Sequence, residues 1–431
     1  MAGVHSPFTY GHRPLHLFCL ISAVPVLSAA LTALGAQTTS HAADSGGSWK
    51  ELPKVMLQRK NRLRALSLGA VAVTGALALT ACGSDDNGGG DNASGNPSSS
   101  AQAGSIKCDD AKGQLLADGS SAQKNAIDAW VKAFSQACGV QINYKGGGSG
   151  AGVTAFTQGQ VAFAGSDSAL KPEEVTASKK VCSGGQGIDL PMVGGPIALG
   201  YNVPGVDNLV LDAPTIAKIF DSKITKWNDP AIAKLNKGVK LPDLKIQAFH
   251  RSDESGSTDN FTKYLIATTP GNWKYSGGKA WQAKGGQSAP QSAGVAQQVK
   301  QTSGAIGYFE LSYVKDGVKA VSIDTGASKP VAPSSDSATA DIAAAKVIGT
   351  GKDLALQLDY KTKAEGAYPI TLVTYEIVCD KGNKADTLPA TKAFLRYIAS
   401  EDGQKVLSGI DYAPVPAEII AKVRTTIEGL S

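Results

Sequence analysis

Histidine is scarce in this sequence, and its cysteines are widely scattered. Only one of the five histidines, His250, follows residue 82, and the spacing of the six cysteines matches no zinc motif. Zinc sites need Cys and His ligands at short, regular intervals, and a Ser-His-Asp triad needs a histidine beside its nucleophile. We therefore expect no metal site, no cofactor and no histidine-based hydrolysis.

Most of the chain also lacks net charge. The formal charge of +5 comes from the residues before Cys82, because those after it comprise 35 basic and 35 acidic residues. Nucleic-acid-binding domains carry clustered Lys and Arg, so we expect no nucleic-acid partner. A chain of 431 residues with 42% hydrophobic content can bury a sizeable core and form more than one lobe.

The early basic residues belong to a segment that has the features of an export signal. From residue 56 to residue 82 the chain reads MLQRKNRLRALSLGAVAVTGALALTAC, with a basic head, an apolar stretch and a small-residue end. The apolar run is shorter than the ~20 residues of a membrane-spanning helix. Its end, LTAC, resembles the bacterial lipobox, which implies that Cys82 is acylated and becomes the mature N-terminus.

The sequence around this signal suggests how the chain is organised. A secretion signal belongs at the start of a chain, so we interpret residues 1–55 as an extension from a misassigned start codon and residues 56–81 as the signal peptide. Residues 82–105 are rich in Gly, Ser and Asn, which predicts a flexible tether. We expect a globular domain anchored by lipid to the extracytoplasmic face of the cell membrane.

Four cysteines remain after residue 82, an even number that suits an oxidising compartment. They allow three pairings, of which we favour Cys108–Cys138 and Cys182–Cys379. Cys108 precedes the first predicted strand, and Cys138 ends the helix that returns along it. Cys182 and Cys379 flank two long apolar runs on the same side.

Short strands and helices alternate from residue 113 onward. Residues 113–121, 140–145 and 161–170 have strand patterns, and residues 122–138 and 153–159 have helical ones. This β-α-β-α-β order predicts a largely parallel sheet covered by helices. Two apolar runs at 189–203 and 368–379 are candidates for crossings between lobes. The predicted lobes are residues 106–193 plus 371–431, and residues 194–370.

Three predicted strand-to-helix junctions are rich in glycine and hydroxyl side chains. They are residues 118–122 (DGSSA), 146–152 (GGGSGAG) and 255–258 (SGST). Unpaired N–H groups at helix N-termini attract anions. One such junction is ordinary N-capping, but three of them, with Arg251 beside the third, favour a shared anion site.

The second junction also fits a dinucleotide-binding fingerprint. Gly146, Gly148 and Ala151 match G-x-G-x-x-G/A after a strand, and Asp167 follows about twenty residues later. A single match is weak, and Asp167 lies in a loop-like stretch, SDSAL. An exported protein also has little access to NAD, so we disfavour this alternative.

Six motifs in order resemble the PstS family, the phosphate-binding lipoproteins of phosphate ABC transporters. They are NYKGGGSGAGV, FAGSDSAL, KITKWNDPAIAKLN, FHRSDESGSTDNFTKYL, SGAIGYFELSYV and YPIT. The resemblance extends from about residue 113 to the C-terminus. It implies the two-lobed α/β fold of class II periplasmic binding proteins, in which two mainly parallel sheets flanked by helices are joined by two crossing strands.

The resemblance also implies which residues bind phosphate. From the first lobe these are Ser121, the N–H of Ala122, Ser149 and Asp167, and from the second lobe Arg251, Ser255, Gly256 and Ser257. Three positions depart from the family pattern: Ala122 replaces a bulky residue, Ser257 a threonine and Glu254 a glycine. The carboxylate of Glu254 would repel an anion unless it turns to solvent or pairs with a cation.

The implied function is capture of inorganic phosphate without catalysis. Asp167 can only accept a hydrogen bond when ionised, so it favours an oxyanion that keeps a proton, as phosphate does and sulfate does not. The implied partners of this monomer are two permease subunits and, through them, a cytoplasmic ATPase. The alternatives are a phosphatase built on a phosphate site and a binder of sulfate or molybdate.

The lipobox resemblance makes a testable prediction about processing. In membranes of the native host, the mature protein should begin at a diacylated Cys82 and lack residues 1–81. Mass spectrometry of the membrane fraction tests this, and a peptide from residues 1–55 would contradict both the cleavage and the start-site interpretation.

Overall fold

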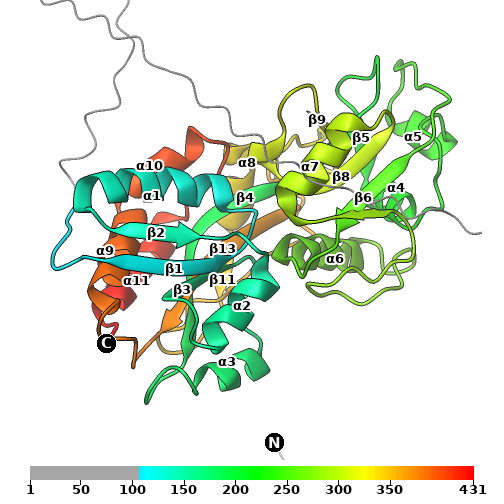
Figure 1. Cartoon of the computed structure of the whole chain (residues 1–431). Helices are drawn as coiled ribbons and strands as arrows, with labels where there is room; N and C mark the ends of the chain where they lie inside the picture. The colour runs from blue at the N-terminus through cyan, green and yellow to red at the C-terminus, as the bar shows by residue number, and fades with distance from the viewer. Residues whose placement is uncertain (1–105) are drawn as a thin grey trace, which may run out of the picture. The chain divides into compact units, whose positions relative to one another are not determined.

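A nine-stranded sheet runs through the residues that the computed structural model describes, 106–431 (Figure 1). The predicted export signal, Cys82 and the predicted tether lie outside these residues. The strand order is β2 (Gln141–Tyr144), β1 (Gln114–Gly119), β3 (Phe163–Ser166), β13 (Thr371–Cys379), β4 (Gly187–Asn202), β8 (Ala305–Glu310), β6 (Gln247–Arg251) and β7 (Gln287–Ala289), with β9 (Lys319–Ala320) paired to β4.

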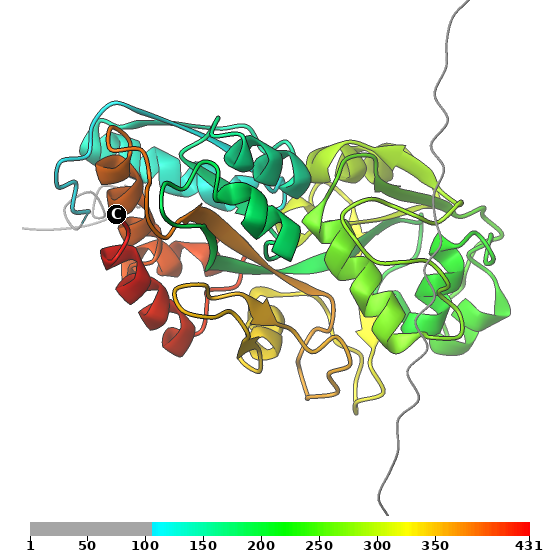
Figure 2. The same ribbon diagram turned by 90° about the horizontal axis from the view of Figure 1, so that it is seen from below.

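Each end of this sheet is parallel and its centre is antiparallel. Strand β1 pairs in parallel with β2 and β3, and β6 pairs in parallel with β7 and β8. Between these groups, β13 runs antiparallel to β3 and β4, and β4 runs antiparallel to β8. Figure 2 shows β4 and β13 side by side where they link the two halves. The predicted α/β fold with two crossing strands is confirmed.

Helices cover the first parallel group of strands. They are α1 (Lys124–Cys138), α2 (Ser149–Thr157), α3 (Pro172–Ser178), α9 (Leu388–Ile398), α10 (Glu401–Ser408) and α11 (Ala417–Glu428). Helix α1 buries Ala126, Ile127, Trp130 and Phe134, as its apolar spacing predicts. The ring of Phe134 lies 5.4 Å from that of Phe394, between centroids, so the core joins early and late parts of the chain.

The second parallel group has its own core and helices. The helices are α4 (Ala213–Phe220), α5 (Pro230–Leu235), α6 (Gly256–Thr268) and α7 (Gln291–Gln301), followed by the 3-10 turn η1 (Leu311–Tyr313). Strand β5 (Val210–Asp212) pairs with β10 (Ser322–Asp324). The rings of Phe220, Phe261 and Tyr308 pack together, with Phe261 and Tyr308 centroids 4.7 Å apart.

The segment before β13 returns to the first core. Helix α8 (Ser335–Ile342) and the pair β11 (Lys346–Val347) and β12 (Leu356–Gln357) precede the second crossing. Ala338 and Ile342 pack in the cluster that contains Trp130. The sequence analysis assigned residues 194–370, which include α8, to the second lobe. Helix α8 packs on the first core because the chain returns to that core before β13 begins.

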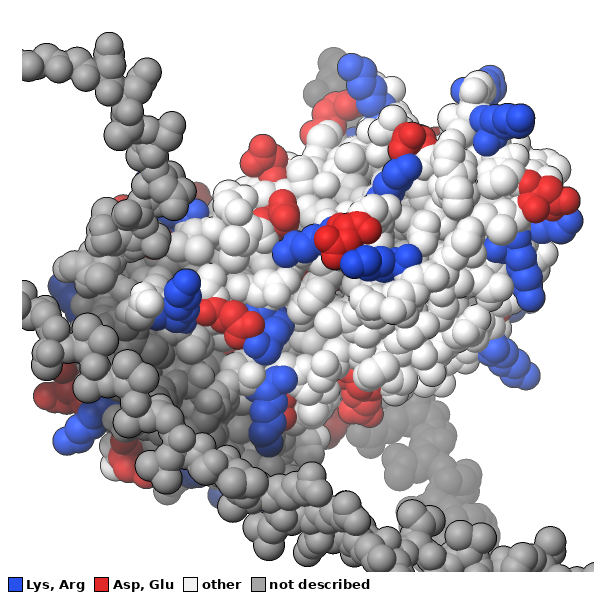
Figure 3. Space-filling model, turned by 45° about the horizontal axis from the view of Figure 1, so that its top comes forward, with Lys and Arg blue, Asp and Glu red and all other residues white. Residues whose placement is uncertain are grey.

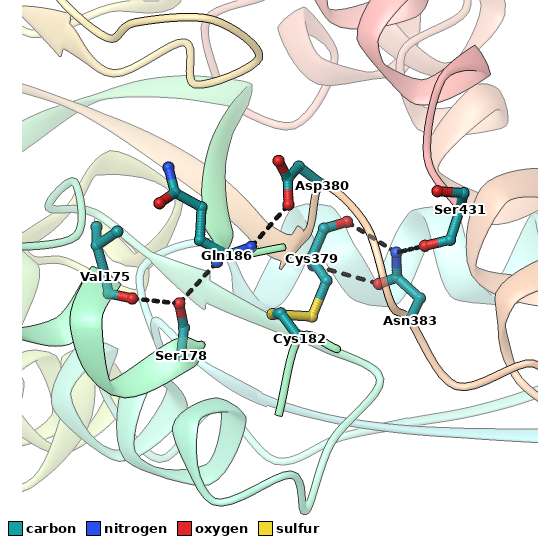
Figure 4. Close-up of a disulfide and its surroundings, with 9 residues drawn as sticks. Val175, Ser178, Cys182, Gln186, Cys379, Asp380, Asn383 and Ser431 are labelled. Atoms are coloured by element: carbon teal, nitrogen blue, oxygen red, sulfur yellow. Dashed lines mark hydrogen bonds between the residues drawn. A yellow bond between two sulfur atoms is a disulfide. The ribbon is translucent and has the colours of Figure 1, made fainter. Parts of the chain in front are cut away.

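Two disulfides confirm the favoured pairing. Cys108 is bonded to Cys138 and Cys182 to Cys379. Cys379 ends β13, and Asn383 brackets it, since the Cys379 N–H donates to Asn383 Oδ1 (3.2 Å) and Asn383 Nδ2 donates to the Cys379 carbonyl (2.8 Å) (Figure 4). The second bridge therefore joins the loop before β4 to the end of β13.

One face of the molecule carries both signs of charge without segregation. On the face in Figure 3, basic and acidic side chains are interspersed, in agreement with the balanced composition after Cys82. Within residues 106–431, no helix combines the length and hydrophobicity needed to span a bilayer.

The two disulfides should differ in their effect on stability. A cross-link restricts the unfolded chain more when it closes a longer loop, and the sequence separations are 30 and 197 residues. We expect the Cys182→Ser/Cys379→Ser protein to lose about 1–2 kcal/mol more free energy of unfolding than the Cys108→Ser/Cys138→Ser protein. Urea unfolding of both variants measures this difference, and equal losses would contradict the chain-entropy account.

Candidate functional site

The three glycine- and hydroxyl-rich junctions all follow the carboxyl ends of parallel strands. Residues 120–123 link β1 to α1, residues 145–148 link β2 to α2, and residues 252–255 link β6 to α6. Ligands of α/β sheets bind outside the carboxyl ends of strands. The helix N-termini from both lobes therefore face one candidate anion site.

Ser149 joins the two lobes at this site. Its Oγ accepts hydrogen bonds from the N–H of Asp167 (3.2 Å) and from the N–H of Gly256 (3.1 Å). The same hydroxyl lies 3.4 Å from Asp167 Oδ2, to which it donates. Thus Ser149 and Asp167 of the first lobe lie in contact with Gly256 of the second.

Asp167 is almost completely buried and held by several donors. Thr374 Oγ1 donates to Asp167 Oδ1 at 2.7 Å, and Asp167 is 3% exposed. Burial raises the pKa of Asp167, while hydrogen bonds from Ser120 and Thr374, the charge of Arg251 and a bond from Ser149 lower it; burial outweighs them. The carboxylate is thus a strong hydrogen-bond acceptor in a desolvated environment.

Arg251 is buried and oriented by an aspartate that the sequence analysis did not single out. Its Nε donates to Asp253 Oδ1 at 2.9 Å, its Nη2 donates to Asp253 Oδ2, and its Nη1 lies 3.5 Å from Ser292 Oγ. Burial raises the pKa of Asp253, but the hydrogen bonds and the charge of Arg251 lower it by more than burial raises it, so the net shift is downward. The spacing Arg-Ser-Asp was a signal that could have identified this pair.

The N-terminus of α6 brings hydroxyl groups to the same place. Ser255 caps the helix and accepts from the N–H of Thr258 at 3.3 Å. The hydroxyl of Ser257 is buried and has no hydrogen-bond partner among the described residues. A buried polar atom without a partner is costly, which marks Ser257 as a ligand-binding candidate.

Ser121 and Ala122 are bonded within the protein. Ser121 Oγ accepts from the N–H of Ser292 (3.0 Å), the second residue of α7 in the second lobe. The N–H of Ala122 donates to Ser120 Oγ (3.0 Å). Both predicted residues lie on the α1 junction as expected. Ser292 was missed because its contact with Ser121 spans 171 residues of sequence.

Glu254 turns away from the buried groups. Its side chain is exposed, and its carbonyl accepts from the N–H of Gly150 at 3.0 Å. A Cβ on Gly150 would lie 2.3 Å from Glu254 Oε2 and only 2.4 Å from Glu254 Cβ, which cannot move without the backbone, so this close contact requires glycine. The carboxylate therefore lies near the N-terminus of α2, where the helix dipole favours negative charge.

The dinucleotide alternative does not fit this geometry. A Cβ on Gly148 would lie 2.6 Å from Asp253 Oδ2, which shows how closely the second lobe covers the glycine loop. A pyrophosphate could not approach that loop in this conformation. Among the described residues, no group of three or more His, Cys, Asp or Glu is placed to hold a metal ion.

Comparison with known proteins identifies the relatives of this chain. A PBP superfamily domain matches residues 104–402. Phosphate-binding protein PstS 3 of Mycobacterium leprae (strain TN) is 42% identical over 370 residues, which cover 85% of this chain and 98% of the relative. Phosphate-binding protein PstS3 of Mycobacterium bovis (strain BCG / Pasteur 1173P2) is 41% identical over 367 residues, 84% of this chain and 97% of the relative.

A solved structure supports the same fold. The crystal structure of a phosphate-binding protein from Stenotrophomonas maltophilia covers 72% of this chain and 93% of its own, with 18% identity and a TM-score of 0.59. At this identity the likeness concerns the fold alone.

The Arg251–Asp253 pair should stabilise the protein in a pH-dependent way. Because the pKa of Asp253 is lowered in the folded protein, its contribution is present above the unfolded pKa of about 3.9 and is lost as pH falls through the folded value. We expect Asp253→Asn to reduce the free energy of unfolding by roughly 1.5–3 kcal/mol near pH 7. Urea unfolding from about pH 3 to pH 7 should show this difference shrinking in acid, and a constant difference would contradict the pairing.

Proposed function

The chain belongs to the PstS family of phosphate-binding proteins, and from this premise we propose that its two lobes close on one phosphate between Asp167 and Arg251. As a member of this family, it is a solute-binding protein that captures phosphate. One observation carries the proposed site: a buried arginine and a buried aspartate meet helix N-termini from both lobes.

The proposed site replaces the water that phosphate loses on binding. Desolvating an anion is costly unless many hydrogen bonds form at once. Arg251 supplies a charged planar fork, held in place by Asp253. The N–H groups at the start of α6 and the hydroxyl of Ser257 supply neutral donors. Ser121, Ala122, Ser149 and Ser255 complete the proposed set through their hydroxyl and N–H groups, and would exchange some present bonds for bonds to phosphate.

Asp167 determines selectivity in this proposal. Its carboxylate accepts hydrogen bonds and repels anions that have no proton to donate. Because burial raises its pKa, it attracts a proton more strongly than an ordinary aspartate does. Phosphate at neutral pH keeps at least one proton and can donate it to Asp167, whereas sulfate has none.

Closure of the lobes would couple capture to transport. Contacts from Ser149 and Gly256 join the lobes across the site, so a ligand that binds both sides favours the closed form. We propose that the closed monomer delivers phosphate to two permease subunits of an ABC importer, whose ATPase is cytoplasmic. In this proposal, lipid on Cys82 holds the protein at the extracytoplasmic face of the cell membrane.

Two alternatives remain experimentally distinguishable from this function. The relatives are named phosphate-binding proteins, which favours binding over hydrolysis, and release of phosphate from a model ester would instead indicate a phosphatase. Isothermal titration with phosphate, arsenate, sulfate and molybdate, using protein that starts near Gly104, identifies the anion. Tighter binding of sulfate or molybdate than of phosphate would overturn the proposed selectivity.

Asp167→Asn should change selectivity more than shape. The amide offers a donor where the proton of phosphate needs an acceptor, so phosphate binding should weaken by roughly 1.5–3 kcal/mol, the range for a hydrogen bond to a charged group. Sulfate binding should stay equal or improve, because the repelling charge is gone. Titration of both anions against wild type and variant gives the ratio of their affinities.

Arg251→Ala is the matched comparison for that ratio. Loss of the guanidinium should weaken phosphate and sulfate alike, because its charge does not distinguish protonated from unprotonated oxyanions. If Asp167→Asn leaves the phosphate-to-sulfate preference unchanged, Asp167 only caps the end of β3 and does not select the ligand.

A further inference from the structure

Glu376 is a fully buried carboxyl group whose two oxygens have no hydrogen-bond partner among the described residues. It lies on β13, two residues after Thr374, which donates to Asp167. Residues two apart on a strand share a face, so Glu376 lies behind the proposed phosphate site. An ionised carboxylate without donors in such a place would be very costly.

A second buried oxygen without a partner is found beside it. Oε1 of Gln123 has no donor among the described residues, and Gln123 is the side chain whose hydrogen bonding affects Glu376. Gln123 immediately precedes α1 and is fully buried. One proton on Glu376 would convert two unsatisfied acceptors into a donor and an acceptor.

The direction of the neighbouring hydrogen bonds identifies the two ends of the Gln123 amide. A backbone carbonyl only accepts, so Tyr144 must donate its hydroxyl proton to the carbonyl of Ser120 (2.8 Å). The Tyr144 oxygen then accepts from Nε2 of Gln123 (2.9 Å). The other end of the amide is therefore Oε1, which needs a donor.

Gly165 makes room for this arrangement. In the sheet, Glu376 lies opposite Gly165 on β3. A Cβ on Gly165 would lie 2.1 Å from Gln123 Nε2 and 2.4 Å from the Tyr144 hydroxyl. The absence of a side chain at this position therefore lets the amide and the phenol lie over β3, the strand that precedes Asp167.

We propose that Glu376 is kept as a neutral acid that donates its proton to Gln123 Oε1, which completes a hydrogen-bonded chain through Tyr144 to Ser120. Ser120 begins the turn that contains Ser121 and Ala122, and its hydroxyl accepts from the N–H of Ala122. Glu376 thus positions the phosphate-binding turn when it is protonated. When it loses the proton, it adds negative charge behind Asp167. This inference rests on the proposed function.

The groups around Glu376 agree with a neutral acid. Burial raises the pKa of Glu376 to about 8; the nearby amide of Gln123 opposes the shift and the charge of Asp167 adds to it. Asp118, Asp167 and Glu376 all raise the pKa of Tyr144. Of the acids on other elements packed against β13, Asp189 on β4 accepts from the N–H of Leu170, Asp341 on α8 accepts from Thr371, and Asp259 on α6 pairs with Lys263.

Loss of this proton should weaken phosphate binding in alkaline solution. An ionised Glu376 adds a second negative charge behind Asp167 and breaks the chain that holds Ser120. Phosphate, itself an anion, would then bind best to the protonated form, so binding and protonation are linked. One linked proton changes affinity by at most about tenfold per pH unit.

The test compares wild type with Glu376→Gln by titration of inorganic phosphate from about pH 6.5 to about pH 9.5. The amide keeps a donor for Gln123 Oε1 and cannot ionise. Because both proteins meet the same ionic form of phosphate at each pH, the ligand's own titration cancels in the ratio of affinities. We expect wild type to lose affinity relative to the variant by about threefold or more between pH 7 and pH 9.5.

Three further measurements separate the outcomes. Glu376→Met removes the donor and should bind phosphate more weakly at pH 7 than Glu376→Gln does. Tyr144→Phe cuts the chain without touching Glu376 and should weaken binding about threefold to tenfold, a typical loss for one hydrogen bond. Asp341→Asn removes another buried acid, whose pKa is raised to about 7, and should keep the wild-type pH profile.

An infrared difference between wild type and Glu376→Gln tests the proton directly. At pH 7 the difference should contain the carbonyl stretch of a protonated carboxyl group, and that band should disappear as pH rises above about 9. Parallel phosphate profiles together with no such band would overturn the inference while leaving phosphate capture intact. Failure of wild type to bind phosphate at any pH would instead overturn the proposed function.

Discussion

The site depends on the contact between Arg251 and Asp253, because it places a positive charge inside the protein before any ligand arrives. A buried guanidinium without a partner would be strongly unfavourable. Asp253 offsets that cost through two hydrogen bonds and also fixes the plane of the fork. The Nη1 group of Arg251 lies 3.5 Å from Ser292 Oγ. Hydroxyl and N–H groups can then complete an anion site without a further cation.

The opposite arrangement holds for the acidic side of the site. Asp167 is surrounded by donors that are neutral, from Thr374, Ser120 and Ser149, and the nearby guanidinium of Arg251 already has a carboxylate partner. Its charge is therefore only partly offset. In such a site, Arg251 of the second lobe attracts anions, and Asp167 of the first lobe favours anions that carry a proton. Affinity and selectivity therefore reside in different parts of the fold.

Local patterns in the sequence were sufficient to predict much of this structure. The apolar face of α1, the glycine loop before α2 and the polar end of β3 each follow from a few neighbouring residues, and all are present. Both disulfides could be inferred because their cysteines flank predicted elements. Ser292, Thr374 and Gln123 could not, since each acts through partners that only the folded sheet brings close. The return of α8 to the first core was missed for the same reason.

The disulfide between Cys182 and Cys379 has a mechanical consequence for the movement of the lobes. Gly187 at the start of β4 pairs with Cys379 at the end of β13, so the bridge staples the two-stranded ribbon at its first-lobe end. A stapled ribbon cannot slide one strand along the other, which removes shear as a mode of opening. The remaining freedom is bending and twisting beyond the irregular register between Thr374 and Tyr375. The two-stranded connection between the lobes is therefore fixed at its first-lobe end and can bend beyond it. Thr374, which donates a hydrogen bond to Asp167, lies at the irregularity where this bending would begin.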